Sequence, residues 1–147
     1  MGTKGRDCSI AGALAVIGER WTLLALREVS LGVRRFDHIA RNTGASRDIL
    51  AARLRKLVDA GVLDRVPYQD NPPRHDYVLT EAGRALRPIL HSLMEWGDRY
   101  VTTGEGPTAW EHTCGDELHL RHTCESCGQP VDFDALRPLR VGSVGNT

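Results

Sequence analysis

The chain has 147 residues and no net formal charge, with 41% hydrophobic and 26% charged residues. This composition is typical of one folded domain with room for a small second unit. No apolar run approaches the ~20 residues that a membrane-spanning helix needs, and the first residues lack the apolar core of a secretory signal. A cytoplasmic protein is therefore expected. In its reducing surroundings the four cysteines indicate metal ligands or redox thiols rather than structural disulfides.

Apolar residues recur at helical spacing through most of the first part of the chain. Helices are predicted over residues 8–18, 20–32, 35–44 and 46–61. Thr22 and Ser46 are the candidate N-caps of the second and fourth helices, because their hydroxyl oxygens can accept hydrogen bonds from first-turn amides. Gly61 supplies the left-handed residue that closes the fourth helix.

The pattern then changes from helical spacing to alternation. Residues 62–68 and 75–80 alternate as strands do, and the Gln-Asp-Asn-Pro-Pro-Arg segment between them has the composition of a turn. These features predict a β-hairpin with a loop of five to six residues.

A long helical stretch follows the hairpin. It is predicted over residues 81–102, with Thr80 as its cap and Pro88 marking a kink or a restart. Glycine, proline and threonine then occur in linker proportions, which places a boundary there. The predicted organisation is a mainly α (α+β) domain over residues 8–102 and a small Cys/His-rich extension over residues 103–140.

The zero net charge hides an uneven distribution. Residues 1–80 carry 13 basic against 9 acidic side chains, whereas residues 81–147 carry 6 against 10. The excess concentrates in residues 34–56, where seven basic side chains stand against Asp37 and Asp48. Because clustered Arg and Lys attract phosphates, this segment predicts a polyanion-binding face, with a solvated helix surface as the alternative.

The predicted order of elements is that of a winged helix-turn-helix, in which a recognition helix enters the major groove of DNA and the hairpin forms the wing. Helix 46–61 is the candidate recognition helix, because leucines at helical spacing bury one face and leave the other for a ligand. The predicted DNA-binding residues lie on this helix, before the preceding short helix and beside the hairpin tip: Arg34, Arg35, Ser46, Arg47, Ala51, Ala52, Arg55, Lys56 and Arg74.

These residues divide by the kind of contact expected. Base contacts are expected from Arg47, Ala51, Ala52 and Arg55, because arginine bonds guanine bidentately and small alanines allow close approach. Phosphate contacts are expected from Lys56, Arg34 and Arg35. Arg74 is placed to reach the adjacent minor groove or backbone.

Several short motifs are spread along residues 8–101. They are Cys8, Gly18 with Arg20-Trp21-Thr22, Arg35-Phe36, Leu54-x-x-Leu57-x-x-x-Gly61, Arg65, Pro73-x-x-x-Tyr77-x-Leu79-Thr80-x-x-Gly83 and Trp96-Gly97. Together they resemble the HxlR family of bacterial winged-helix transcriptional regulators. The resemblance implies a homodimer, built by the N-terminal helix and the long C-terminal helix, that binds inverted-repeat DNA. The apolar character of both helices agrees, because one small domain cannot bury both well.

Cys8 lies at the start of the predicted dimer helix. Some HxlR-like proteins use a cysteine near this position to sense quinones, aldehydes or oxidants, so the resemblance makes Cys8 a candidate redox sensor. Such a role requires a reactive thiolate that a reagent can reach, and a small buried apolar residue is the alternative. A small-molecule or electrophile effector is accordingly a candidate partner.

Residues 111–130 hold three of the four cysteines and three of the six histidines. Cys124-x-x-Cys127-Gly resembles half of a zinc ribbon, because such a turn directs two thiolates to one point. The best tetrahedral set is His112, Cys114, Cys124 and Cys127, with His122 or His119 as substitutes for the first. A structural zinc is the predicted cofactor, and a disulfide or a metal-free turn remains the alternative.

The leading hypothesis is a cytoplasmic, homodimeric transcriptional regulator that binds double-stranded DNA. The alternative is a zinc-binding or thiol-redox protein whose winged helix docks a protein partner. No Ser/His/Asp ordering, glycine-rich phosphate loop or paired-acid cluster indicates an enzyme.

Overall fold

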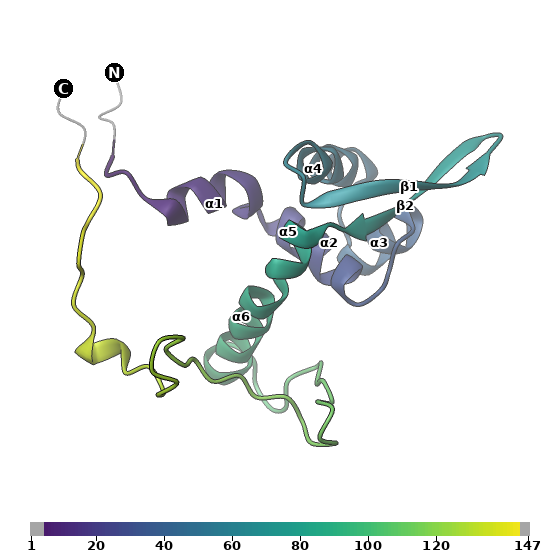
Figure 1. The fold of residues 1–147 in the computed structure, drawn as a ribbon. Coiled ribbons are helices and arrows are strands. Elements are labelled where there is room, and N and C mark those ends of the chain that lie inside the picture. The colour runs from purple at the N-terminus through teal and green to yellow at the C-terminus, as the bar shows by residue number, and fades with distance from the viewer. Residues whose placement is uncertain (1–4, 145–147) are drawn as a thin grey trace. The chain divides into compact units, whose positions relative to one another are not determined.

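The computed structural model describes residues 5–144 (Figure 1). The chain divides into two compact units, one spanning Asp7–Leu90 and the other formed by residues 5–6 together with 91–144. The first unit contains α1 (Ser9–Ile17), α2 (Arg20–Ser30), α3 (Phe36–Thr43), α4 (Arg47–Asp59), β1 (Leu63–Asp70), β2 (Pro73–Leu79) and α5 (Glu81–Ala85). Helix α6 (Arg87–Tyr100) begins at the end of the first unit and continues into the second, which also contains the short 3-10 turn η1 (Phe133–Ala135).

The core of the first unit is built by α2, α3 and α4. Leu26 of α2, Ile39 of α3 and the predicted leucine stripe of α4 are fully buried, and Leu63 at the start of β1 joins them. Each buried leucine or isoleucine contributes about 1.5–3 kcal/mol relative to an exposed position. This packing fixes α4 against the two helices that precede it.

The ends of these helices follow local signals, with one exception. The Ser46 hydroxyl oxygen accepts a hydrogen bond from the Ile49 amide at 3.4 Å, as a cap should, and Gly61 adopts the left-handed φ of +70° predicted for it. Thr22 is not a cap, which corrects the prediction. Helix α2 begins at Arg20 with Glu19 in the N-cap position, and Thr22 is fully buried inside the helix because it lies on the face that packs into the core.

The hairpin is longer than the sequence pattern predicts. Strands β1 and β2 pair antiparallel from Leu63 opposite Leu79 to Asp70 opposite Pro73, with an irregularity near Pro67. The predicted loop is therefore too long, because turn-forming residue types can also pair along the exposed edges of a two-stranded ribbon. Figure 1 shows the hairpin extending beyond the helices of its own unit.

The predicted helix over residues 81–102 is interrupted. The Thr80 hydroxyl accepts a hydrogen bond from the Gly83 amide at 3.1 Å and donates to the Gly61 carbonyl at 2.6 Å, so it caps α5 as predicted. Helix α5 ends after one turn and α6 restarts with Pro88 in its first turn, which confirms the predicted restart. Among residues 5–144, no single helix is long and apolar enough to cross a membrane, and α1 with α2 passes that test only as a pair bent by 77°.

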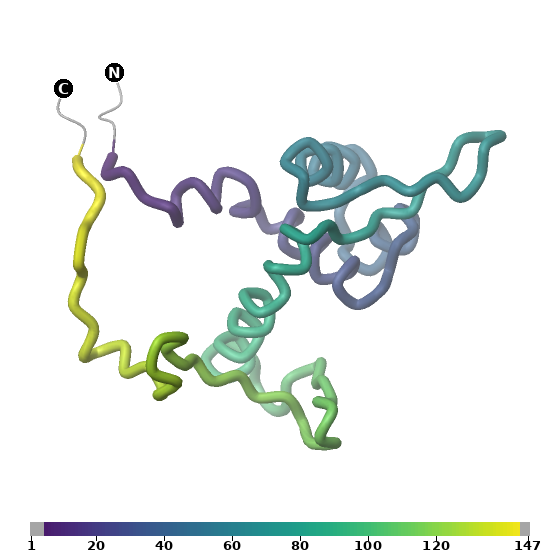
Figure 2. Tube along the Cα trace, viewed as in Figure 1, coloured from purple at the N-terminus to yellow at the C-terminus, as the bar shows by residue number. Residues whose placement is uncertain are grey.

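The second unit consists of most of α6 and the tail, residues 101–144, which is largely irregular (Figure 2, green to yellow). Contacts with His91 and Glu95 attach the tail to the helix. The rings of His91 and Trp110 meet edge to face with centroids 5.1 Å apart. The Glu95 carboxylate accepts a hydrogen bond from the Leu120 amide at 3.0 Å. The tail therefore covers the side of α6 that carries His91 and Glu95.

Candidate nucleic-acid interface

The outward face of α4 is the centre of the candidate interface. Asp48, Ala52, Arg55 and Asp59 are exposed, and their spacing of three to four residues puts them on one side of the helix. Because the leucines opposite are buried, this side is fixed toward solvent. The structure thus presents a small side chain, Ala52, beside a long cationic one, Arg55.

Arg47 lies on one flank of this face and connects α4 to α3. Its Nη1 donates a hydrogen bond to Asp37 Oδ1 at 2.7 Å, and its guanidinium lies 4.9 Å from the centroid of the Phe36 ring. That hydrogen bond, together with the positive charge of Arg47, holds the pKa of Asp37 below its usual value. The pair joins the start of α4 to the start of α3. Ala51 lies half-buried on the same flank.

On the other flank of this face, Glu19 forms ion pairs with residues of α4. The sequence patterns did not predict this role for Glu19. Lys56 Nζ lies 3.5 Å from Glu19 Oε1, and Arg53 pairs with the second oxygen of the same carboxylate. These contacts connect α4 to the residue before α2. Lys56 is consequently half-buried and directed toward Glu19, at the edge of the exposed face.

Arg35 connects the helices to the wing. Its Nε lies 2.7 Å from Asp76 Oδ1, and its guanidinium is 3.5 Å from the centroid of the Tyr68 ring. Tyr68 belongs to β1 and Asp76 to β2, so these contacts fix the middle of the hairpin against the segment that precedes α3. Neither partner was predicted, because no local sequence pattern pairs positions so far apart.

The remaining predicted DNA contacts lie away from α4. Arg34 and Arg35 are neighbours in the segment that precedes α3. The Arg34 carbonyl accepts a hydrogen bond from the Tyr77 amide at 2.9 Å, and the Arg34 side chain lines a pocket beside β2. Arg74 is exposed near the hairpin tip and pairs with Gln69 in the strand ladder.

Cys8 occupies the residue before α1 and is exposed. Its thiol is therefore accessible to a reagent, which is one of the two conditions for sensing. The role itself stays a prediction.

The predicted zinc ligands fall into two pairs in the tail. His112 Nδ1 lies 3.3 Å from Cys114 Sγ in one turn. The second pair is Cys124 and Cys127. The backbone N–H groups of Cys127 and Ser126 donate hydrogen bonds to the Cys124 sulfur, and together with the Cys127 thiol they lower the pKa of Cys124. Within residues 5–144, no three side chains of His, Cys, Asp or Glu gather as a metal site. The donor types suit zinc, but the structure does not bring the two pairs together, so structural zinc stays a prediction.

The buried helical core, the outward face of α4 and the hairpin that follows it define a winged helix-turn-helix protein, a fold whose recognition helix reads DNA. The model of the HxlR-like helix-turn-helix family matches residues 16–105, and the chain belongs to this family.

Individual relatives agree with this assignment. An uncharacterized HTH-type transcriptional regulator of Mycobacterium tuberculosis is 50% identical over 132 residues, covering 88% of this chain and 84% of its own. The crystal structure of PA1607, named as a candidate transcription factor, matches with a TM-score of 0.80 at 34% identity over 91% of this chain and 95% of its own. The reduced form of the redox regulator HypR matches with a TM-score of 0.58 at 32% identity, over 64% of this chain and 96% of its own. The chain is thus similar to transcriptional regulators.

Proposed function

We propose that this regulator is a cytoplasmic homodimer that recognises an inverted-repeat operator through the outward face of α4. The proposal rests on the exposed surface formed by Ala52 and Arg55. The Arg47–Asp37 contact on one flank and the Lys56–Glu19 contact on the other keep this surface in place. A helix that is buried on one side and braced at its N-terminal end is suited to enter the major groove without reorganising.

The basic residues have different tasks in this proposal. Arg55 is exposed and extends from the centre of the face, so it is the residue proposed to bond a guanine. Arg47 contributes a base contact only after it leaves Asp37. Arg74 on the wing contacts the backbone or the minor groove, whereas Arg35 and Lys56 support the interface mainly by holding its parts in place. Ser46 caps the helix, and its exposed position also allows a phosphate contact.

The dimer proposal is supported by the apolar side of α6. Ile89, Leu93, Trp96 and Tyr100 follow one another at spacings of four, three and four residues, so they form one stripe along the helix. All of them are at least half exposed, with Tyr100 at 64%. The tail contacts the helix at His91 and Glu95, which lie on a different side. A stripe of this size is commonly covered by a partner, and the family resemblance indicates a second copy of the chain.

The signal that controls binding is proposed to be a small reactive or redox-active molecule. Exposure of the Cys8 thiol beside the apolar helix α1 supports this, because modification there would alter a surface proposed to join two copies.

The test is equilibrium binding of the full-length protein to duplex DNA from the region upstream of its own gene, measured by fluorescence anisotropy in a salt series. A steep decrease of log K with log salt and a preference over scrambled DNA are expected. Arg55→Ala should lose about 1–3 kcal/mol of discrimination at one base position per half-site. Arg121→Ala, an exposed arginine of the tail, is the matched control and should bind as wild type does.

The alternative, a zinc or thiol protein that docks a protein partner, predicts a different outcome. In that case scrambled and native DNA bind equally, and Arg55→Ala and Arg121→Ala weaken binding by the same small amount.

A further inference from the structure

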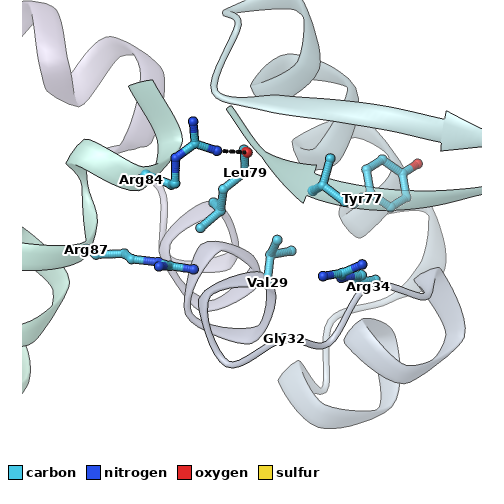
Figure 3. A pocket seen from close by; sticks show the side chains of 8 residues that line it. Val29, Gly32, Arg34, Tyr77, Leu79, Arg84 and Arg87 are labelled. Carbon is cyan, nitrogen blue, oxygen red and sulfur yellow. Dashed lines mark hydrogen bonds between the residues drawn. The ribbon is translucent and has the colours of Figure 1, made fainter. Parts of the chain in front are cut away.

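A shallow pocket of about 360 Å³ lies between the C-terminal end of α2 and strand β2 (Figure 3). Part of its lining is apolar and part is cationic. The lining includes Val29, Tyr77 and Leu79 together with Arg34, Arg84 and Arg87. All of them belong to the first unit, so the pocket is formed within one compact body.

The arginines are arranged around the apolar part. Figure 3 shows Arg34 and Arg87 extending toward Val29 from opposite sides. Arg84 is held at the rim, where its Nη1 donates a hydrogen bond to the Leu79 carbonyl at 3.0 Å. Two cationic groups thus face each other across an apolar surface, and a third lies beside them.

Arg34 and Arg87 differ in charge pairing from several arginines of the same unit that are paired with acidic side chains. Arg35, Arg47 and Arg53 each pair with a carboxylate. Within residues 5–144, no carboxylate lies within ion-pair distance of Arg34 or Arg87. Like charges that converge repel each other, and an anion placed between them removes that cost. A guanidinium pair is also well shaped to hold a carboxylate through parallel N–H···O bonds.

We propose that this pocket binds a small organic anion, with its carboxylate between Arg34 and Arg87 and its apolar body over Val29, Leu79 and the Tyr77 ring. The volume lies at the lower end of the range for small-molecule sites. The bound molecule would touch α2, the wing strand β2 and the α5–α6 junction together. Its influence on DNA binding rests on the function proposed above, whereas the binding itself does not.

Isothermal titration of the full-length protein without DNA tests the site. Benzoate is the probe, benzamide has the same apolar body without the charge, and inorganic phosphate has charge without the apolar body. Saturable binding of one benzoate per chain is expected, with benzamide and phosphate each at least about tenfold weaker.

Substitutions test which arginines bind the benzoate carboxylate. Arg34→Gln and Arg87→Gln should each weaken benzoate binding by at least about tenfold, because each removes a charged donor pair. Arg41→Gln, an exposed arginine of α3 outside the pocket, is the matched control and should leave the affinity within about twofold. Circular dichroism of each variant verifies that the helices are retained.

Two results overturn the proposal. One is the absence of saturable benzoate binding up to about 10 mM, a concentration at which even a millimolar site would be occupied. The other is unchanged benzoate affinity in both pocket variants. If those variants instead lose DNA affinity alone, the arginines hold DNA phosphates and the pocket assignment is wrong, while the proposed DNA-binding function stands.

Discussion

Replacing Glu28 by alanine is expected to loosen the attachment of α3 to α2. Glu28 is 4% exposed, and its carboxylate connects the two helices. One oxygen accepts hydrogen bonds from Arg27 Nε at 2.9 Å and Nη2 at 2.6 Å, and the other accepts from Asn42 Nδ2 at 2.8 Å. Because the Asp37–Arg47 ion pair joins α3 to α4, this carboxylate contributes to the placement of α4.

The expected cost follows from these contacts. The Arg27 side chain is 46% exposed, so water can replace its contact and screening reduces its value. The bond from Asn42 crosses between helices to a charged acceptor, and such a bond contributes about 1.5–3 kcal/mol. With the lost packing of a buried side chain, Glu28→Ala should lower the free energy of unfolding by about 2–3 kcal/mol.

Urea unfolding followed by circular dichroism measures this change, at one fixed chain concentration because the protein is proposed to dimerise. Glu105→Ala, an exposed acid in the tail, should stay within about 0.5 kcal/mol of wild type. A double-mutant cycle with Asn42→Ala should give a coupling of about 1 kcal/mol or more. A Glu28→Ala protein as stable as the Glu105→Ala control would refute the reasoning.

Three further substitutions and one metal analysis have defined outcomes. Gly83→Ala should destabilise the protein by at least about 2 kcal/mol in thermal unfolding, because the added Cβ would lie 2.2 Å from the Val62 carbonyl oxygen. A Gly83→Ala protein as stable as wild type would show that the backbone at residue 83 is not packed closely against Val62. If the protein is the proposed dimer, Leu93→Glu should sediment as a monomer in analytical ultracentrifugation, because the charge enters the apolar stripe of α6; a dimer retained by this variant would show that the stripe is not the dimer interface. Cys8→Ser should abolish the effect of diamide on DNA binding; a response equal to that of wild type would remove Cys8 as the sensor. Elemental analysis of the purified protein should find one zinc per chain, and readily titrating tail thiols without metal would eliminate the structural zinc.

Much of the DNA-reading unit was predictable from local patterns. The leucine spacing of α4, the Ser46 and Thr80 caps, the Gly61 terminator and the restart at Pro88 each depend on residues a few positions apart. Signals of this kind are carried by the sequence itself, because helix periodicity and capping are short-range effects.

The contacts that brace the interface were not predictable. Glu19 meets Lys56, and Arg35 meets Asp76, only after the helices have packed and the hairpin has folded back. The same is true of the arginines that converge beside Val29. Sequence patterns identified which side chains were charged, but the pairing of those charges depends on tertiary contacts between distant segments.

Selection of bound duplexes from a randomised DNA pool tests the central claim most directly. The wild-type protein should enrich a two-fold symmetric sequence, with a guanine in each half-site that Arg55→Ala no longer selects. An enriched sequence that is identical for wild type and Arg55→Ala, or no enrichment by the wild-type protein, would contradict the assignment of α4 as the helix that reads DNA.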